Sequence, residues 1–175
     1  YSIGHTPGAP VFSPAGDVLY VCSRFTNEVM AVDVKSGKAK STVKLPREPF
    51  ASALLPDGSK LFVANHLPAG AANGEYTGAA ISVVDTKSAK AVATIALPNG
   101  STGLRGACAS PDGRFVYVTH ILARYQLPTT QLERGWMNTN ALSVIDAATN
   151  KLVNTVLLDD VDLGAANPWG VACTP

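Results

Sequence analysis

The sequence predicts an all-β repeat protein, and two observations carry that prediction. One sequence pattern occurs three times, as FSPAGDVLYVCS, LLPDGSKLFVANH and ASPDGRFVYVTH, and each copy is a proline–glycine turn followed by an apolar run. After each copy comes a second run that ends on aspartate, namely EVMAVD, AISVVD and ALSVID. Alternation at period two between Gly, Asp and Asn turns is typical of short antiparallel strands, and three copies indicate a repeat architecture.

Each repeat is expected to hold four strands, named a to d in chain order. Strand a covers residues 9–12, 52–55 and 106–109, and strand b covers residues 18–22, 60–64 and 115–119. Strand c covers residues 28–33, 79–85 and 141–146, and strand d covers residues 40–45, 90–96 and 151–158. No window repeats apolar residues at helical spacing for long, so helix is expected only in the insertions.

The spacing of the repeats separates a constant scaffold from variable loops. The turn prolines Pro14 and Pro56 are 42 residues apart, whereas the next interval, to Pro111, is 55 residues. Most of the extra residues follow strand b and the rest lie in the linker between repeats, because an insertion inside a strand would flip its register. A unit of about 40–45 residues with four short strands is one blade of a β-propeller.

We therefore expect a single partial β-propeller over residues 1–175, a fragment of three four-stranded antiparallel blades. The blades should be arranged radially, with strand a innermost, in a ring that does not close within this chain. They are expected at residues 9–46, 51–98 and 105–160, with the start of a fourth at 170–175. A closed propeller needs roughly 4–8 blades, so we expect a piece of a longer propeller whose open blade edges favour self-association.

The order of motifs in the third copy, PDG then YVTH then SVID, resembles the YVTN-type β-propeller repeat of bacterial exported and surface proteins. The first copy departs from it, with Ala15 in place of the turn aspartate and Cys22 with Ser23 in place of Thr-Asn. The resemblance implies a periplasmic, cell-surface or secreted bacterial protein. The strings HILARYQLPTTQLERGWMNTNAL and LLDDVDLGAANPWG look like a subgroup that is in some cases joined to c-type haem modules of the peroxidase kind.

Charge and cysteine content exclude several classes of partner. The net charge is +1 with 15% charged residues and no basic run, which argues against nucleic acid or an anionic membrane as an electrostatic partner. No apolar stretch reaches 18 residues, so no membrane span is expected. Without CxxC or CxxCH spacing we expect no cofactor in this segment. Buried free thiols are the preferred interpretation of Cys22, Cys108 and Cys173, and a Cys108–Cys173 disulfide between adjacent blades is the alternative.

Candidate binding residues gather on one face of the predicted propeller. The a–b and c–d turns lie on one face and are short, whereas the b–c and d–a connections lie on the other and carry every insertion. Loops on a rigid scaffold are where binding residues concentrate, so we assign a partner-binding role to this insertion face. Its candidate residues are His5, Arg24, His66, Tyr76, His120, Arg124, Tyr125, Arg134, Trp136 and Trp169.

Structural roles are preferred over metal binding for the titratable residues of this face. The three histidines have no HxH or HExxH spacing, so we expect hydrogen-bonded side chains with separate partners and no metal site. The acids Asp159, Asp160 and Asp162 lack the spaced pattern of a calcium loop. The long insertion at residues 121–140 is predicted to be an ordered loop with one helical turn near 131–135.

The favoured function is a binding or scaffold segment of an exported bacterial protein, one that engages a protein or another domain of the same chain through the insertion face. We expect this segment not to be an enzyme. One alternative is an accessory propeller of a haem-containing, peroxidase-like redox protein. A lactonase-type hydrolase is less favoured, because the inner strands carry few titratable groups to converge on a central channel.

Overall fold

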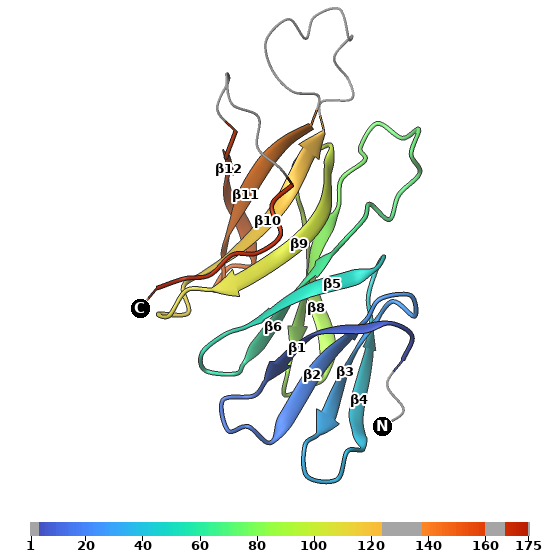
Figure 1. The fold of residues 1–175 in the computed structure, drawn as a ribbon, viewed down its shortest axis with the longest axis vertical. Coiled ribbons are helices and arrows are strands. Elements are labelled where there is room, and N and C mark those ends of the chain that lie inside the picture. Colours follow the sequence, from blue (N-terminus) through green and yellow to red (C-terminus); the bar gives the residue numbers. More distant parts are fainter. Residues whose placement is uncertain (1–3, 124–137, 160–166, 175) are drawn as a thin grey trace, which may run out of the picture.

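A computed structural model describes residues 4–123, 138–159 and 167–174 of the chain, and these form three separate antiparallel sheets of four strands (Figure 1). The first sheet holds β1 (Pro7–Phe12), β2 (Val18–Ser23), β3 (Glu28–Asp33) and β4 (Ala39–Lys44). The second holds β5 (Pro49–Leu54), β6 (Lys60–Asn65), β7 (Ala80–Asp85) and β8 (Lys90–Ala96). The third holds β9 (Ser101–Ala109), β10 (Phe115–Ala123), β11 (Asn138–Asp146) and β12 (Lys151–Leu157).

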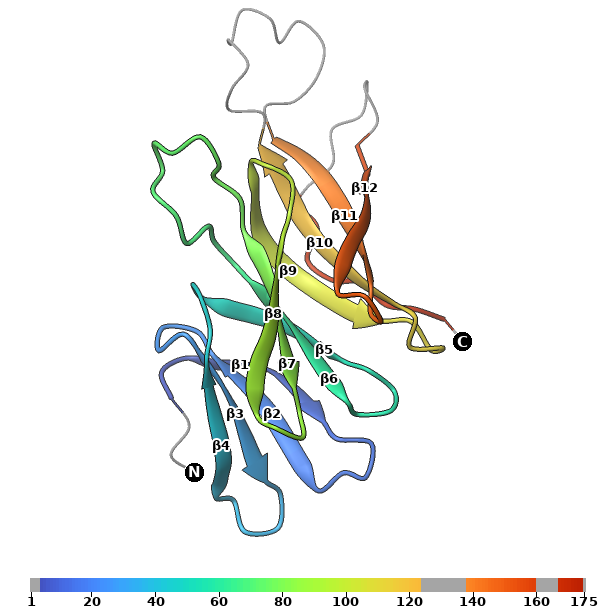
Figure 2. The ribbon, with the colours of Figure 1, turned by 180° about the vertical axis from the view of Figure 1, so that it is seen from behind.

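Each sheet is a simple meander, and the three are arranged as blades that do not close into a ring. The inner strand β5 contacts both β1 and β9, so the a strands line the inside of the arc. The exposed strands β4, β8 and β12 lie on the outside and are seen from behind in Figure 2. The predicted fold class, an all-β propeller fragment with strand a innermost, is therefore confirmed.

Local hydrogen bonds explain why the repeated turns recur. Asp33, Asp85 and Asp146 each end a c strand, and each carboxylate accepts a bond of 2.7 Å from the backbone N–H three residues later. These bonds stabilise the charged carboxylates and hold their pKa values below the usual range. The three aspartates therefore stabilise the turns that follow the c strands.

The core lies between the blades, which explains the burial pattern of the middle blade. All of β6 from Leu61 to Asn65 is buried, because one face of the blade packs on the first sheet and the other on the third. Leu61 and Val63 join the cluster shared with the first blade, whereas Phe62 and Ala64 join the cluster shared with the third. Packing between neighbouring blades therefore fixes their relative positions.

The structure extends the third blade beyond the prediction. Strand β9 begins at Ser101, and β10 and β11 continue pairing as far as Ala123 opposite Asn138. The ends of the long insertion thus form a β-ladder, which polar residues on β11 concealed in the sequence. The helical turn predicted near 131–135 lies outside the described residues. Within the described part of the chain, no helix is long and apolar enough to span a bilayer.

Candidate functional site

The backbone of the inner strands is irregular where it reaches the insertion face. In β5 the pairing shifts between Pro49 and Ala51, which leaves Phe50 as an extra residue. In β9 residues 103–105 lie opposite His120 alone, and the N–H of Gly103 donates to the carbonyl of His66 at 2.8 Å. Bulges of this kind re-aim side chains and recur beside functional sites. Here the two bulges lie at the ends of β5 and β9 that border the insertion face, which we call the mouth of the arc.

Three side chains at this mouth occupy the same position of the repeat. Phe50, Arg105 and Trp169 each lie six residues before the turn proline of their repeat. The guanidinium carbon of Arg105 lies 4.7 Å from the centroid of the Trp169 ring, and Phe50 meets the same ring edge-on at 6.3 Å. Because the blades are arranged radially, one repeat position delivers three side chains to one place.

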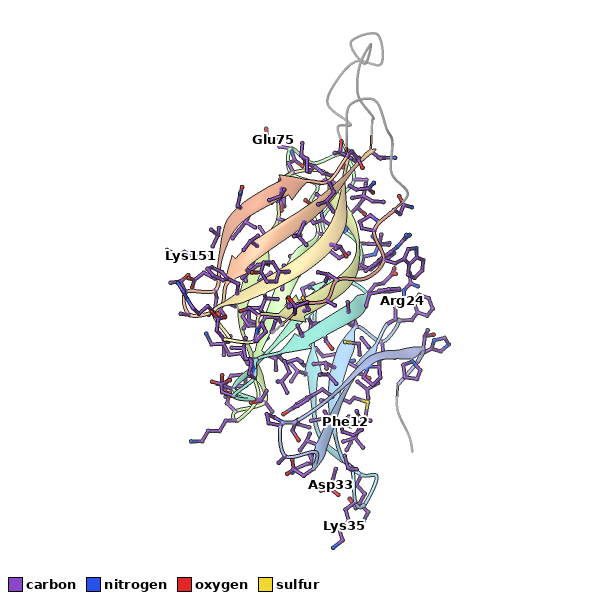
Figure 3. The ribbon with its side chains drawn as sticks, turned by 60° about the vertical axis from the view of Figure 1, so that its left-hand side comes forward. Phe12, Arg24, Asp33, Lys35, Glu75 and Lys151 are labelled. Carbon is purple, nitrogen blue, oxygen red and sulfur yellow. The ribbon has the colours of Figure 1, made fainter. Side chains whose placement is uncertain are left out.

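Arg24, on the b–c connection of the first blade, joins this group from the other side. Its Nε and Nη2 both donate to Oε2 of Glu48, at 3.0 and 2.8 Å. Its guanidinium carbon also lies 5.1 Å from the Phe25 ring centroid and 5.2 Å from that of Phe50. The His5 ring contacts Phe25 at 5.5 Å. Figure 3 shows Arg24 on the side of the molecule opposite Lys151, which begins β12.

His66 links the middle of this group to the third blade. Its ring stacks on Phe50 with centroids 4.8 Å apart, and its Nδ1–H donates to the carbonyl of Leu104 at 3.1 Å. Burial lowers the pKa of His66 from its ordinary value, and the charges of Arg24 and Arg105 lower it further. The neutral ring with its proton on Nδ1 is therefore favoured, and its Nε2 presents a lone pair.

Together these side chains form one arginine–aromatic cluster on the insertion face. Two guanidinium groups are matched by one carboxylate, so the cluster carries an excess of positive charge. Two of its rings are open to solvent, with Trp169 65% exposed and Phe25 54% exposed. A cationic surface with exposed rings can bind an acidic or aromatic group. Its members are His5, Arg24, Phe25, Glu48, Phe50, His66, Arg105 and Trp169.

The structure brings together four of the residues predicted for the binding face, namely His5, Arg24, His66 and Trp169. Tyr76 lies apart, on the insertion of the second blade, where its hydroxyl donates to the carbonyl of Leu97. The remaining predicted residues Arg124, Tyr125, Arg134 and Trp136 lie outside the described residues.

His120 is fully buried within the third blade, so its side chain does not reach the surface of the binding face. Its Nε2 lies 2.8 Å from the hydroxyl of Ser143, on the neighbouring strand. The three histidines have separate hydrogen-bond partners, as predicted. Asp159 is also bonded locally, since its carboxylate accepts bonds from the backbone and side chain of Asn140.

Four cluster residues are not among the predicted binding residues, namely Phe25, Glu48, Phe50 and Arg105. For Phe50 a usable signal existed, because it occupies the repeat position of Arg105 and Trp169. For Glu48 the signal is conformational, since it is a non-glycine residue with φ of 54°. Such left-handed residues are uncommon and concentrate at functional sites, but sequence does not display them.

Comparisons with known proteins support the propeller fold. No family model matches the chain. It is 33% identical over 75 residues to the hydrazine synthase subunit beta of Kuenenia stuttgartiensis, a match over 43% of this chain and 19% of that protein. A solved structure of Kuenenia stuttgartiensis hydrazine synthase superposes with a TM-score of 0.61 at 21% identity, over 94% of this chain and 57% of the other.

Two further solved structures share the fold at low identity. U3-55K matches with a TM-score of 0.62 at 13% identity, and the WD40 repeats of RRP9 with 0.61 at 14%. Each match covers 88% of this chain and 40% of the other. The chain thus spans about a fifth of the curated relative and just over half of the solved hydrazine synthase chain. The expectation that this segment is not an enzyme is wrong, because both hydrazine synthase matches are to chains of an enzyme.

Proposed function

We propose that this chain is part of a β-propeller subunit of a multisubunit enzyme, and that the arginine–aromatic cluster binds an acidic segment of a neighbouring subunit. The matched hydrazine synthase chain is a subunit by name, which supports an assembly of several chains. The resemblance to YVTN-type propellers further supports an exported, bacterial location. The observation that carries the proposal is the stacking of Arg105 on a largely exposed Trp169.

The composition of the cluster favours a protein partner with carboxylate groups. Trp and Arg are enriched among the residues that dominate binding energy in protein interfaces. Glu48 already satisfies Arg24, whereas the guanidinium of Arg105 lies on an aromatic face and has N–H donors to offer. An acidic side chain placed there would meet the Arg105 cation beside the solvent-exposed ring of Trp169. Because the partner would exclude water, the Coulomb attraction within that pair would be stronger than in an exposed ion pair.

The test compares Arg105→Gln with Lys151→Gln in the assembled parent enzyme. Both variants remove one positive charge, but Lys151 lies on the opposite side of the molecule (Figure 3). Arg105→Gln should weaken association with the neighbouring subunit by about tenfold, equivalent to about 1.4 kcal/mol, with a smaller salt dependence. Lys151→Gln should leave the dissociation constant unchanged. Equal effects of the two variants, or no effect of Arg105→Gln, would contradict the proposal.

A photocrosslinking amino acid identifies what lies on the cluster. Placed at Trp169 in the assembled enzyme, it should capture a peptide of another subunit that is rich in Asp and Glu. Phe12 is a matched control position, since it is 57% exposed and ends β1 at the other face. Capture from position 12 alone, or of a basic peptide from position 169, would refute the assignment.

A further inference from the structure

Two cysteines far apart in sequence meet at the inner edge of the third blade. Cys108 belongs to β9, and Cys173 lies in the segment 167–174, which runs beside β9 in Figure 1. Their Sγ atoms are 2.8 Å apart although 65 residues separate them in sequence. Even carbon atoms in ordinary contact prefer about 3.5–4.0 Å, and sulfur is larger, so these atoms are closer than two separate thiols would rest.

The surroundings show that packing alone holds this segment weakly. Residues 167–174 form no strand, and they are exposed or half-buried throughout. A cavity of about 380 Å³ lies between the segment and the face of the third blade, lined by Tyr117, Leu142, Val171 and Cys173 among others. A cross-link there would secure a segment that buries little apolar area of its own.

We infer that Cys108 and Cys173 form a disulfide that fastens residues 167–174 to the inner strand β9. The prediction of buried free thiols then applies to Cys22 alone, which is buried in β2 between the first two blades. The other two cysteines are only half-buried, so a small thiol reagent can reach them. The cross-link would also hold Trp169, four residues before Cys173, against Arg105.

The bond forms by thiol–disulfide exchange with a small disulfide such as oxidised glutathione. The Cys173 thiolate attacks the glutathione disulfide, which forms a mixed disulfide and releases one reduced glutathione. Cys108 then loses its proton and attacks the Cys173 sulfur, which releases the second glutathione. Two protein thiols are oxidised and one glutathione disulfide is reduced to two thiols, so atoms and electrons balance.

Ionisation of the Cys108 thiol limits the rate of this exchange. Burial, together with the neighbouring Cys173, raises the pKa of Cys108 to about 12, so little thiolate forms on it at neutral pH. Once Cys173 carries glutathione, burial alone still raises the pKa of Cys108 and slows its attack, but the Cys173 sulfur is held beside it. A thiol of high pKa is also a poor leaving group, so the finished disulfide should resist reduction.

The test equilibrates the purified chain in glutathione buffers of increasing oxidised fraction, followed by acid quenching, alkylation and peptide mass spectrometry. The expected product is one peptide pair joined through Cys108 and Cys173, about 2 Da lighter than the dithiol, with Cys22 still reduced. Cys22→Ala should give the same pair. Cys108→Ser should give no internal disulfide and should leave Cys173 carrying one glutathione.

Each other outcome contradicts the inference. Three alkylated thiols in the most oxidising buffer would show that the two sulfurs do not bond. A disulfide that includes Cys22 would show a different pairing. Mixed glutathione adducts on both Cys108 and Cys173 of the unmodified sequence would show that the sulfurs are accessible but not close enough to react with each other.

Discussion

Replacing His120 by asparagine should reduce the loss of stability of this protein in acid. His120 is fully buried, and its Nδ1 lies 3.1 Å from the carbonyl of Ile121, which can only accept. The proton is therefore on Nδ1, and Nε2 accepts the 2.8 Å bond from the hydroxyl of Ser143. Asn65 occupies the equivalent position of the second blade, and its side-chain amide donates to the hydroxyl of Ser82 at 3.0 Å. Asparagine is thus a compatible substitute at neutral pH.

The sign of the pH effect follows from burial. Burial lowers the pKa of His120, so in acid the unfolded chain binds a proton that the folded chain resists. The stabilising difference is fully present above the unfolded pKa of about 6.5 and is lost as the pH falls from there toward the folded pKa. One proton contributes at most about 1.4 kcal/mol per pH unit, so between pH 6.5 and 5.0 the loss is at most about 2 kcal/mol.

The assay is urea unfolding of the native sequence and of His120→Asn at pH 7.5, 6.5, 5.5 and 5.0. The two proteins should have free energies of unfolding within about 1 kcal/mol at pH 7.5 and should diverge below pH 6.5, where the variant loses less. His66→Asn serves as a second variant, because burial also lowers the pKa of His66. Parallel pH profiles for the native sequence and His120→Asn would refute the reasoning.

Two further predictions concern contacts between blades and close backbone approach. Lys60→Met should lower the free energy of unfolding by about 1–3 kcal/mol in the same urea assay. The Nζ of Lys60 donates to the backbone carbonyl of Ala147 at 2.8 Å and to Asn150 Oδ1 at 3.0 Å, both in the next blade. Lys90→Met, on the exposed strand β8, is the control and should be nearly neutral. Gly100→Ala should cost more than about 3 kcal/mol and broaden thermal unfolding, because the added Cβ would clash with the backbone carbonyl oxygen of Ala123 at a φ of +91°. A melting temperature like that of the native sequence would disprove this packing.

The repeat made most of the fold predictable. Three in-register copies gave twelve strands whose observed bounds differ by a few residues at most outside the third blade, because alternation and turn residues mark both ends of a short strand. The pairing of residues 121–123 with 138–140 was missed, since Asn138, Thr139 and Asn140 carry no apolar alternation. Pairing there is imposed by the neighbouring ladder and not by local propensity.

The site was predictable as a face but not as a set of contacts. The rule that insertions collect on one side placed Arg24, His66 and Trp169 correctly on the same face. Their convergence depends on the extra residue at Phe50 and on the left-handed backbone of Glu48, neither of which has a compositional signature. The pairing of Cys108 with Cys173 was predicted only as the alternative to buried free thiols, because the sequence places both on inner strands but does not give the distance between their sulfurs.

The contrast between the two faces is a physical reason to place binding on the insertion face. On the turn face the carboxylates of Asp33, Asp85 and Asp146 are each used by their own turn, which leaves them little capacity for a partner. On the insertion face the backbone is bulged, and Glu48 has a left-handed φ. The guanidinium of Arg105 also stacks on the exposed ring of Trp169. Strain and exposed aromatic surface both lower stability in isolation. A partner that covers the rings and pairs the guanidinium groups would offset both costs.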